Sequence, residues 1–327
     1  MGEKSYWTQA VSLVTRTLPF IGVNAAVYGA FFVLSLIWFG IWGGLAFLFG
    51  KLGIGVLSTL CVIVGFGAGA GVVKFAQRYL LYMVKGAHIA AMTELLKNGT
   101  LPDGMNQYAY GKATIEKHFK DVSILYGVDT LVTASLRALQ RKVLSFTSWL
   151  PLPDGARDLV RMVTEILNRA LGYVDEAILS YAIYRGEENI WDSARHGIIL
   201  YAQSYKPILI TAAKVWVLSK VIGFVLFAVF MIPAVAVLMF VKSVPFQIIA
   251  VVLAFVASWA FKAALFEPFA LAYNLVTFHH SIVGQVPDPE WDERLGAVSS
   301  KYRELVGKAR DAGQRPFTPA PAPRTVG

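Results

Sequence analysis

The sequence predicts an all-helical, polytopic integral membrane protein with two transmembrane helical hairpins. Of its 327 residues, 56% are hydrophobic and only 16% are charged, which is outside the range of ordinary soluble domains. About 20 apolar residues suffice to cross a bilayer as a helix. Four stretches without any charge meet this requirement, and they cover residues 17–50, 52–73, 221–241 and 243–261.

The four stretches come in two pairs. A single lysine separates the members of each pair, Lys51 in the first and Lys242 in the second. Such short connections force neighbouring helices to run antiparallel, so each pair is predicted to be a hairpin.

The distribution of basic residues predicts the orientation in the membrane. Lys51 and Lys242 are two of the 30 Lys and Arg residues, and the others lie on the opposite side or at its border. By the positive-inside rule, that opposite side is cytoplasmic. We therefore expect a multi-pass membrane location with both termini in the cytoplasm.

Much of the net charge of +9 comes from basic residues at the ends of the spans. One interpretation of this basic collar is binding of anionic lipid headgroups; the other is ordinary snorkelling of interfacial side chains. No arginine-rich run or aromatic platform points to nucleic acid. The collar residues are Lys74, Arg78, Lys214 and Lys220.

Between the hairpins, residues 113–150 and 154–185 are predicted to form two long amphipathic helices, on the membrane surface or as a cytoplasmic pair. Because Ala177–Tyr184 is apolar, an alternative arrangement has six spans. The expected organisation is an N-terminal interfacial helix (1–19), the first hairpin with an extended helix (20–97), cytoplasmic or interfacial amphipathic helices (98–204), the second hairpin (205–280), a cytoplasmic helix (281–312) and a disordered tail (313–327).

Short matches indicate an internal duplication. The sequences WTQA at residues 7–10 and WDSA at 191–194 each precede a proline and a hairpin, and GTLPD at 99–103 and GQVPD at 284–288 each follow one. An even number of spans separates the copies, so they would be parallel repeats.

The sequence lacks the usual signatures of catalysis or of metal and cofactor binding. It has no phosphate-binding loop, no metalloprotease motif and no nucleophile elbow, and Cys61 is the single cysteine. We expect a protein that is not an enzyme and binds no cofactor. The run of alternating glycines is predicted to serve close helix packing instead, and it consists of Gly65, Gly67, Gly69 and Gly71.

The most suggestive polar residues are Lys262 and Glu267, which is followed by Pro268 at the end of the last span. A carboxylate so close to hydrocarbon requires a partner. The pair is a candidate cation-binding or gating site, and the alternative is a buried structural ion pair.

Three short motifs also occur in order, with two spans and an aromatic-rich helix after them: Leu167-Asn168-Arg169, Ala182-Ile183-Tyr184 with Gly186, and Ser193-Ala194-Arg195. Over residues 125–280 the chain thereby resembles the C-terminal part of the choline transporter-like family of polytopic membrane proteins. The resemblance implies the membrane architecture and solute transport, and it transfers no binding residue.

Two functions remain open at the level of sequence. The first is transport of a small cationic or lipid-like solute, which the resemblance and the Lys262 and Glu267 pair favour. The second is a non-enzymatic membrane organiser or accessory subunit, which the amphipathic helices favour. In both cases the expected partners are membrane lipids, including anionic ones, and either further copies of the chain or another membrane protein.

Overall fold

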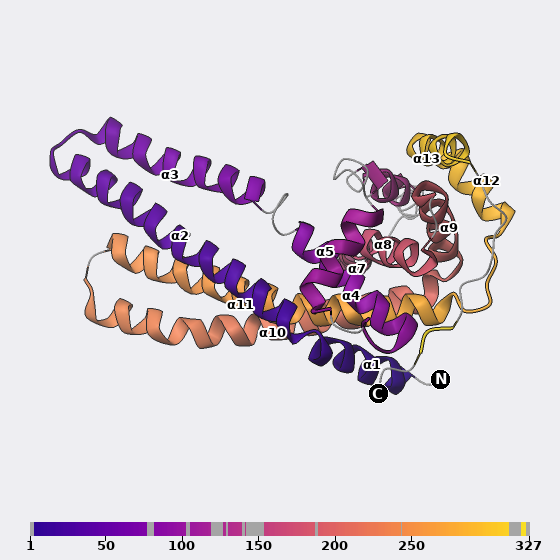
Figure 1. Cartoon of the computed structure of the whole chain (residues 1–327). Helices are drawn as coiled ribbons and strands as arrows, with labels where there is room; N and C mark the ends of the chain where they lie inside the picture. Colours follow the sequence, from indigo (N-terminus) through magenta and orange to yellow (C-terminus); the bar gives the residue numbers. More distant parts are fainter. Residues whose placement is uncertain are drawn as a thin grey trace. The chain divides into compact units, whose positions relative to one another are not determined.

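The computed structural model describes residues 3–76, 82–102, 105–118, 127–128, 130–138, 141, 154–186, 189–242, 244–313 and 322–324. All the regular elements in these residues are helices, so the predicted all-helical class is confirmed (Figure 1). The helices are α1 (Glu3–Arg16), α2 (Leu18–Lys51), α3 (Gly55–Ala76), α4 (Tyr82–Asn98), α5 (Gln107–His118), α7 (Asp154–Leu171), α8 (Val174–Arg185), α9 (Ile190–Gln203), α10 (Tyr205–Phe240), α11 (Val244–Ser281), α12 (Pro289–Val298) and α13 (Ser300–Asp311).

Among the described residues, three helical segments are long and apolar enough to cross a membrane. They are α2, α10 and residues 247–281 of α11, and they cover most of three of the four predicted stretches. The fourth stretch lies largely in α3, whose apolar part among these residues, Gly55–Gly65, is shorter.

The chain divides into two compact units. We call Pro19–Lys85 with Ser219–Pro268 the apolar unit. The remaining segments, Met1–Leu18, Gly86–Leu218 and Phe269–Gly327, form the head unit.

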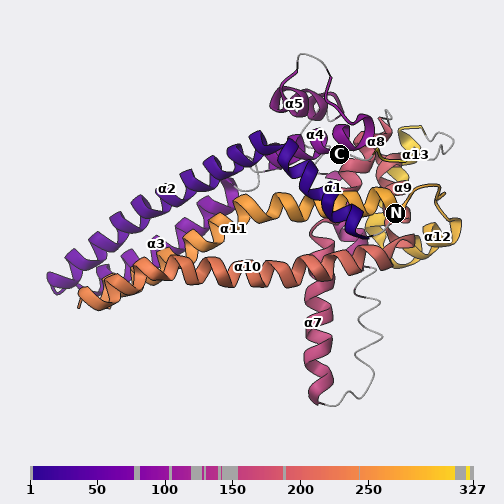
Figure 2. The same ribbon diagram turned by 90° about the horizontal axis from the view of Figure 1, so that it is seen from below.

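Within the apolar unit, α2 and α3 lie side by side (Figures 1 and 2). Gly53 turns the chain between them with a φ of 75°, a conformation that glycine adopts without strain. Two hydrogen bonds then join the helices. Trp38 Nε1 donates to the Gly65 carbonyl at 2.7 Å, and Ser58 Oγ donates to the Ala46 carbonyl at 2.8 Å.

The second pair in this unit is α10 with α11. The side chain of Gln247 donates to the carbonyls of Val241 (2.9 Å) and Leu238 (3.3 Å), which satisfies acceptors that the end of α10 leaves open. Farther along, the rings of Phe230 and Phe261 pack with centroids 5.0 Å apart.

The core of the head unit forms where α8 and α9 pack closely. Gly197 makes this possible, because a Cβ at that position would lie 3.2 Å from side-chain atoms of both Ile178 and Tyr181. Residues 177–184 are all buried, and their apolarity serves this core. The 12-residue α8 is also too short to cross a bilayer, which argues against the six-span alternative in this part of the chain.

Two helix boundaries differ from the sequence prediction. The predicted helix at 154–185 is broken between α7 and α8 at Gly172 and Tyr173. The predicted helix at 281–312 is two helices, because Ser299 adopts an extended conformation and its hydroxyl accepts a hydrogen bond from the Tyr302 N–H. Much of the predicted helix at 113–150 lies outside the described residues.

Four residues of the predicted disordered tail, Gly313 and Ala322–Arg324, are described, and Arg324 caps the end of α4. The Arg324 N–H donates to the Leu96 carbonyl at 2.8 Å, and its guanidinium donates to the Asn98 carbonyl at 3.3 Å. These carbonyls lie in the last turn of α4, where helical partners run out. Residues 314–321 and 325–327 lie outside the described part.

Candidate functional site

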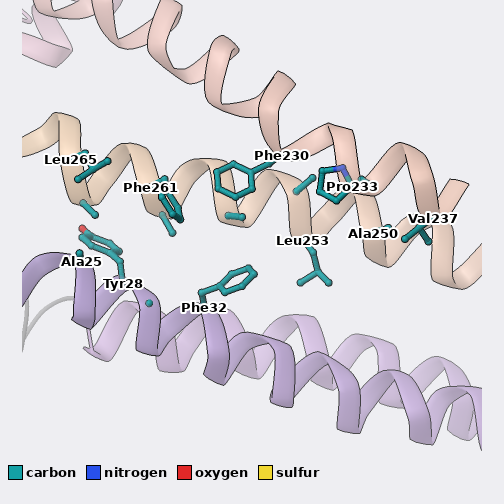
Figure 3. Close-up of a pocket in the computed structure, with 16 residues that line it drawn as sticks. Ala25, Tyr28, Phe32, Phe230, Pro233, Val237, Ala250, Leu253, Phe261 and Leu265 are labelled. Atoms are coloured by element: carbon teal, nitrogen blue, oxygen red, sulfur yellow. The ribbon is translucent and has the colours of Figure 1, made fainter. Parts of the chain in front are cut away.

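The apolar unit contains a cavity of about 400 Å³ between α2 and the α10–α11 pair (Figure 3). Figure 3 shows Tyr28 and Phe32 extending from α2 toward the other two helices. Phe230 and Pro233 contribute from α10. The α11 wall owes its depth to small side chains on one face: Ala250, Ala254, Ala257, Ala260 and Ala264.

The cavity is apolar and open to its surroundings. Among its described lining residues, the Tyr28 hydroxyl is the one polar side-chain group. Phe261 and Leu265 border the cavity and are 50% and 51% exposed. The opening is therefore bordered by exposed apolar side chains.

The predicted Lys262 and Glu267 pair belongs to α11, and neither residue is among those that line the cavity. Glu267 follows two positions after Leu265, which lines the cavity from α11. Lys262 lies against α10, where its Cδ would be 3.5 Å from a Cβ placed on Gly223. An ion pair between Lys262 and Glu267 therefore stays a prediction.

Tyr28 is a lining residue of the cavity that sequence reasoning missed. One feature of the sequence could have identified it, because Tyr28 is the single tyrosine in the uncharged stretch 17–50. A tyrosine hydroxyl usually finds a polar partner when it is buried, so this position is unusual in such an apolar helix.

A second cavity of about 640 Å³ lies between the α2–α3 pair and the first part of α11. Trp42 and Phe47 of α2 form part of its wall, and Cys61 contributes from α3. Among its described lining residues, Lys51 is the one charged residue. Leu253 lines both cavities, so its side chain lies between the two spaces.

The predicted glycine contacts can be examined at two of the four positions. A Cβ on Gly65 would lie 2.9 Å from Trp42 Cβ, so this position requires glycine. A Cβ on Gly67 would meet nothing within 4 Å. Gly69 and Gly71 belong to α3, but the surroundings of these two positions lie outside the described residues.

The predicted basic collar is described only in part. Lys214 and Lys220 are exposed side chains of α10. The Lys74 side chain and all of Arg78 lie outside the described part of the chain. Binding of lipid headgroups by these residues therefore stays a prediction.

In the head unit, a serine and a histidine that the sequence separates by 99 residues are hydrogen bonded. Ser180 Oγ lies 2.8 Å from His279 Nε2 and 2.7 Å from Thr93 Oγ1, and the Thr93 hydroxyl donates to the Ile89 carbonyl at 2.6 Å. Every group is satisfied if His279 donates to Ser180 and Ser180 donates to Thr93. In that arrangement the imidazole is not a base toward Ser180, and the fully buried serine is unsuited to attack a substrate.

No group of three or more His, Cys, Asp or Glu residues in the described part of the chain could hold a metal ion. No protein family model, curated protein or solved structure matches the chain. The resemblance to the choline transporter-like family therefore stays a prediction.

Proposed function

We propose that this chain is a multi-pass membrane protein that binds a lipid-like solute in the cavities of the apolar unit, without catalysing a reaction. The observation that carries this proposal is the pair of cavities that share Leu253 in their walls. Both have volumes within the range of about 300–1,000 Å³ typical of ligand sites. Their walls are almost entirely hydrocarbon, which suits an acyl chain.

The lining favours a lipid-like solute over a small cation. The smaller cavity has no carboxylate among its described lining residues, and Glu267 lies outside that set. A small cation would lose its hydration in this space without a counter-charge, which costs several kcal/mol or more. An alkyl chain carries no such cost, since apolar cavities exclude water.

The proposed topology has two transmembrane hairpins, with both termini in the cytoplasm. The antiparallel pairs α2–α3 and α10–α11 support the hairpins. Similar breaks support a parallel repeat: one residue, Thr17, separates α1 from α2, and one residue, Ser204, separates α9 from α10. Gly99 and Gly284, at matching positions in the proposed repeat, have φ angles of 78° and 71°.

The second candidate function is a membrane organiser, and α7 favours it. This helix has Met162 and Val163 39% and 47% exposed, with Arg161 also exposed. An amphipathic helix of this kind can lie in the bilayer interface. Here the head unit, not the cavities, would carry the function.

The test is photocrosslinking in phosphatidylcholine nanodiscs with an alkyl probe that carries a diazirine on its chain. We expect labelled peptides from the cavity walls in α2 and α11. Leu253→Trp enlarges a side chain in the wall of both cavities and should reduce this labelling severalfold. Val229→Trp is the matched control, since Val229 is 51% exposed and lines neither cavity.

Uniform labelling of all lipid-facing surfaces, with no effect of Leu253→Trp, would refute the binding function. Flux of the same probe between the leaflets of liposomes then separates a transporter from a static binder. Flux above that of empty liposomes would show that membrane organisation is not the whole function of the protein.

A further inference from the structure

The larger cavity has one feature that the smaller one lacks, a charge at its edge. Lys51 ends α2 and lines the cavity. Its ammonium lies 5.0 Å from the ring centroid of Phe47, which also lines the cavity. The cation is thus held at the wall of an otherwise apolar space.

The hydroxyl of Ser58, which also lines this cavity, already makes a hydrogen bond within the protein. The Ser58 hydroxyl donates to the Ala46 carbonyl at 2.8 Å, which joins α3 to α2. Among the described lining residues, Lys51 is therefore the group that supplies charge to recognise a ligand.

Two physical requirements identify the ligand. A cavity of about 640 Å³ with apolar walls excludes water and leaves its lining without contacts unless hydrocarbon fills it. An ammonium at the edge attracts a negative head group. A single-chain amphiphile with an anionic head meets both requirements.

We propose that the larger cavity binds the alkyl chain of an anionic single-chain amphiphile, with Lys51 pairing its head group. This rests on the proposed function and narrows it to one class of solute. A long-chain carboxylate is the simplest member of this class, and the corresponding alcohol is its neutral counterpart.

The experiment compares two diazirine probes with identical 16-carbon chains, palmitate and hexadecanol, in phosphatidylcholine nanodiscs. At about pH 8.5 a carboxylic acid is ionised and a lysine is protonated. We expect the palmitate probe to label the wall segments of α2, α3 and α11 about fivefold more than the alcohol. This ratio corresponds to the binding free energy that a partly exposed ion pair contributes.

Three variants test whether Lys51 causes the preference for the palmitate probe. Lys51→Gln should abolish it without lowering labelling by the alcohol, and Lys51→Arg should retain it. Lys242→Gln is the matched control, because Lys242 is likewise an exposed lysine after a long apolar helix but lines neither cavity.

Cys61 provides an independent measurement. It is the single cysteine of the chain, is 8% exposed and lines the larger cavity. Unlabelled palmitate should slow its alkylation by an apolar maleimide more than hexadecanol does, in the wild type and not in Lys51→Gln.

The outcomes separate the two proposals. Equal labelling by both probes in the wild type, or a preference that survives Lys51→Gln, overturns the anionic specificity and leaves the lipid-like binding function standing. Labelling of the walls by neither probe overturns both.

Discussion

Arg195 in α9 forms a two-point ion pair with Asp292 in α12. Arg195 Nε donates to Asp292 Oδ1 at 3.2 Å, and Nη2 donates to Oδ2. The Tyr302 hydroxyl of α13 donates to the same carboxylate. Three helices of the head unit therefore share one acidic side chain.

Replacing this carboxylate should destabilise the head unit at neutral pH. Partial burial alone would raise the pKa of Asp292, but the hydrogen bonds from Arg195 and Tyr302 outweigh it and hold the pKa below its usual value. The folded state therefore gains stability above the usual Asp pKa and loses it as the pH falls through the lowered pKa. Asp292→Asn should cost about 2 kcal/mol at neutral pH and flatten the acid dependence.

Thermal unfolding in detergent, followed by circular dichroism at several pH values, measures this effect. Glu290→Gln is the control, because Glu290 pairs with Arg294 on the exposed surface of α12. An acid dependence that is the same in Asp292→Asn and the wild type would contradict the assignment.

Asn189 joins α9 to α13 through both atoms of its side-chain amide. Its oxygen accepts from the Asp192 N–H at 3.1 Å and caps α9. Its nitrogen donates to the carbonyls of Ala309 (2.8 Å) and Gly313 (3.0 Å). Loss of the cap alone costs about 1 kcal/mol, and Asn189→Ala should cost more because the carbonyls also lose their donor.

Asn189→Asp distinguishes the two roles, since a carboxylate keeps the cap but cannot donate to Ala309 and Gly313. We expect limited proteolysis to cleave near α13 faster in both variants than in the wild type. If Asn189→Asp resists cleavage as well as the wild type does, the link to α13 contributes nothing.

His88 should make the head unit sensitive to acid. Its Nε2 lies 2.9 Å from Thr17 Oγ1, and the Thr17 hydroxyl donates to the Leu13 carbonyl, so His88 is the donor to Thr17. Burial lowers the pKa of His88 from 6.5 to about 3. The folded protein therefore keeps this ring neutral while the unfolded chain takes up a proton below about pH 6.5.

Because the unfolded state binds more protons at His88 than the folded state, a falling pH favours unfolding. Acidification from about pH 6.5 to 5 should remove about 2 kcal/mol of stability through His88. Chemical unfolding at both pH values, in the wild type and in His88→Gln, measures the difference. A pH dependence that His88→Gln leaves unchanged would show that another group is responsible.

The sequence predicted the helical class and most of the long apolar helices, because an uninterrupted apolar stretch can be recognised from neighbouring residues alone. It could not distinguish a membrane segment from a buried one at Ala177–Tyr184, where α9 and the close approach at Gly197 supply the burial. The break at Ser299 depends on a single hydrogen bond to a backbone N–H. Tyr28 was missed because the cavity that it lines is formed with α10 and α11, which come much later in the sequence.

The glycines of α3 offer a test of packing within the apolar unit. Gly65 and Gly67 share one helix and one chemical change, but a methyl group on Gly65 would lie 2.9 Å from Trp42 Cβ, whereas one on Gly67 meets nothing within 4 Å. Gly65→Ala should therefore cost about 1–3 kcal/mol through overpacking. Gly67→Ala should be neutral or stabilising by up to about 1 kcal/mol, because alanine favours the helix. Thermal unfolding of both variants in the same detergent gives the comparison, and equal melting temperatures would mean that Gly65 does not set the spacing of α2 and α3.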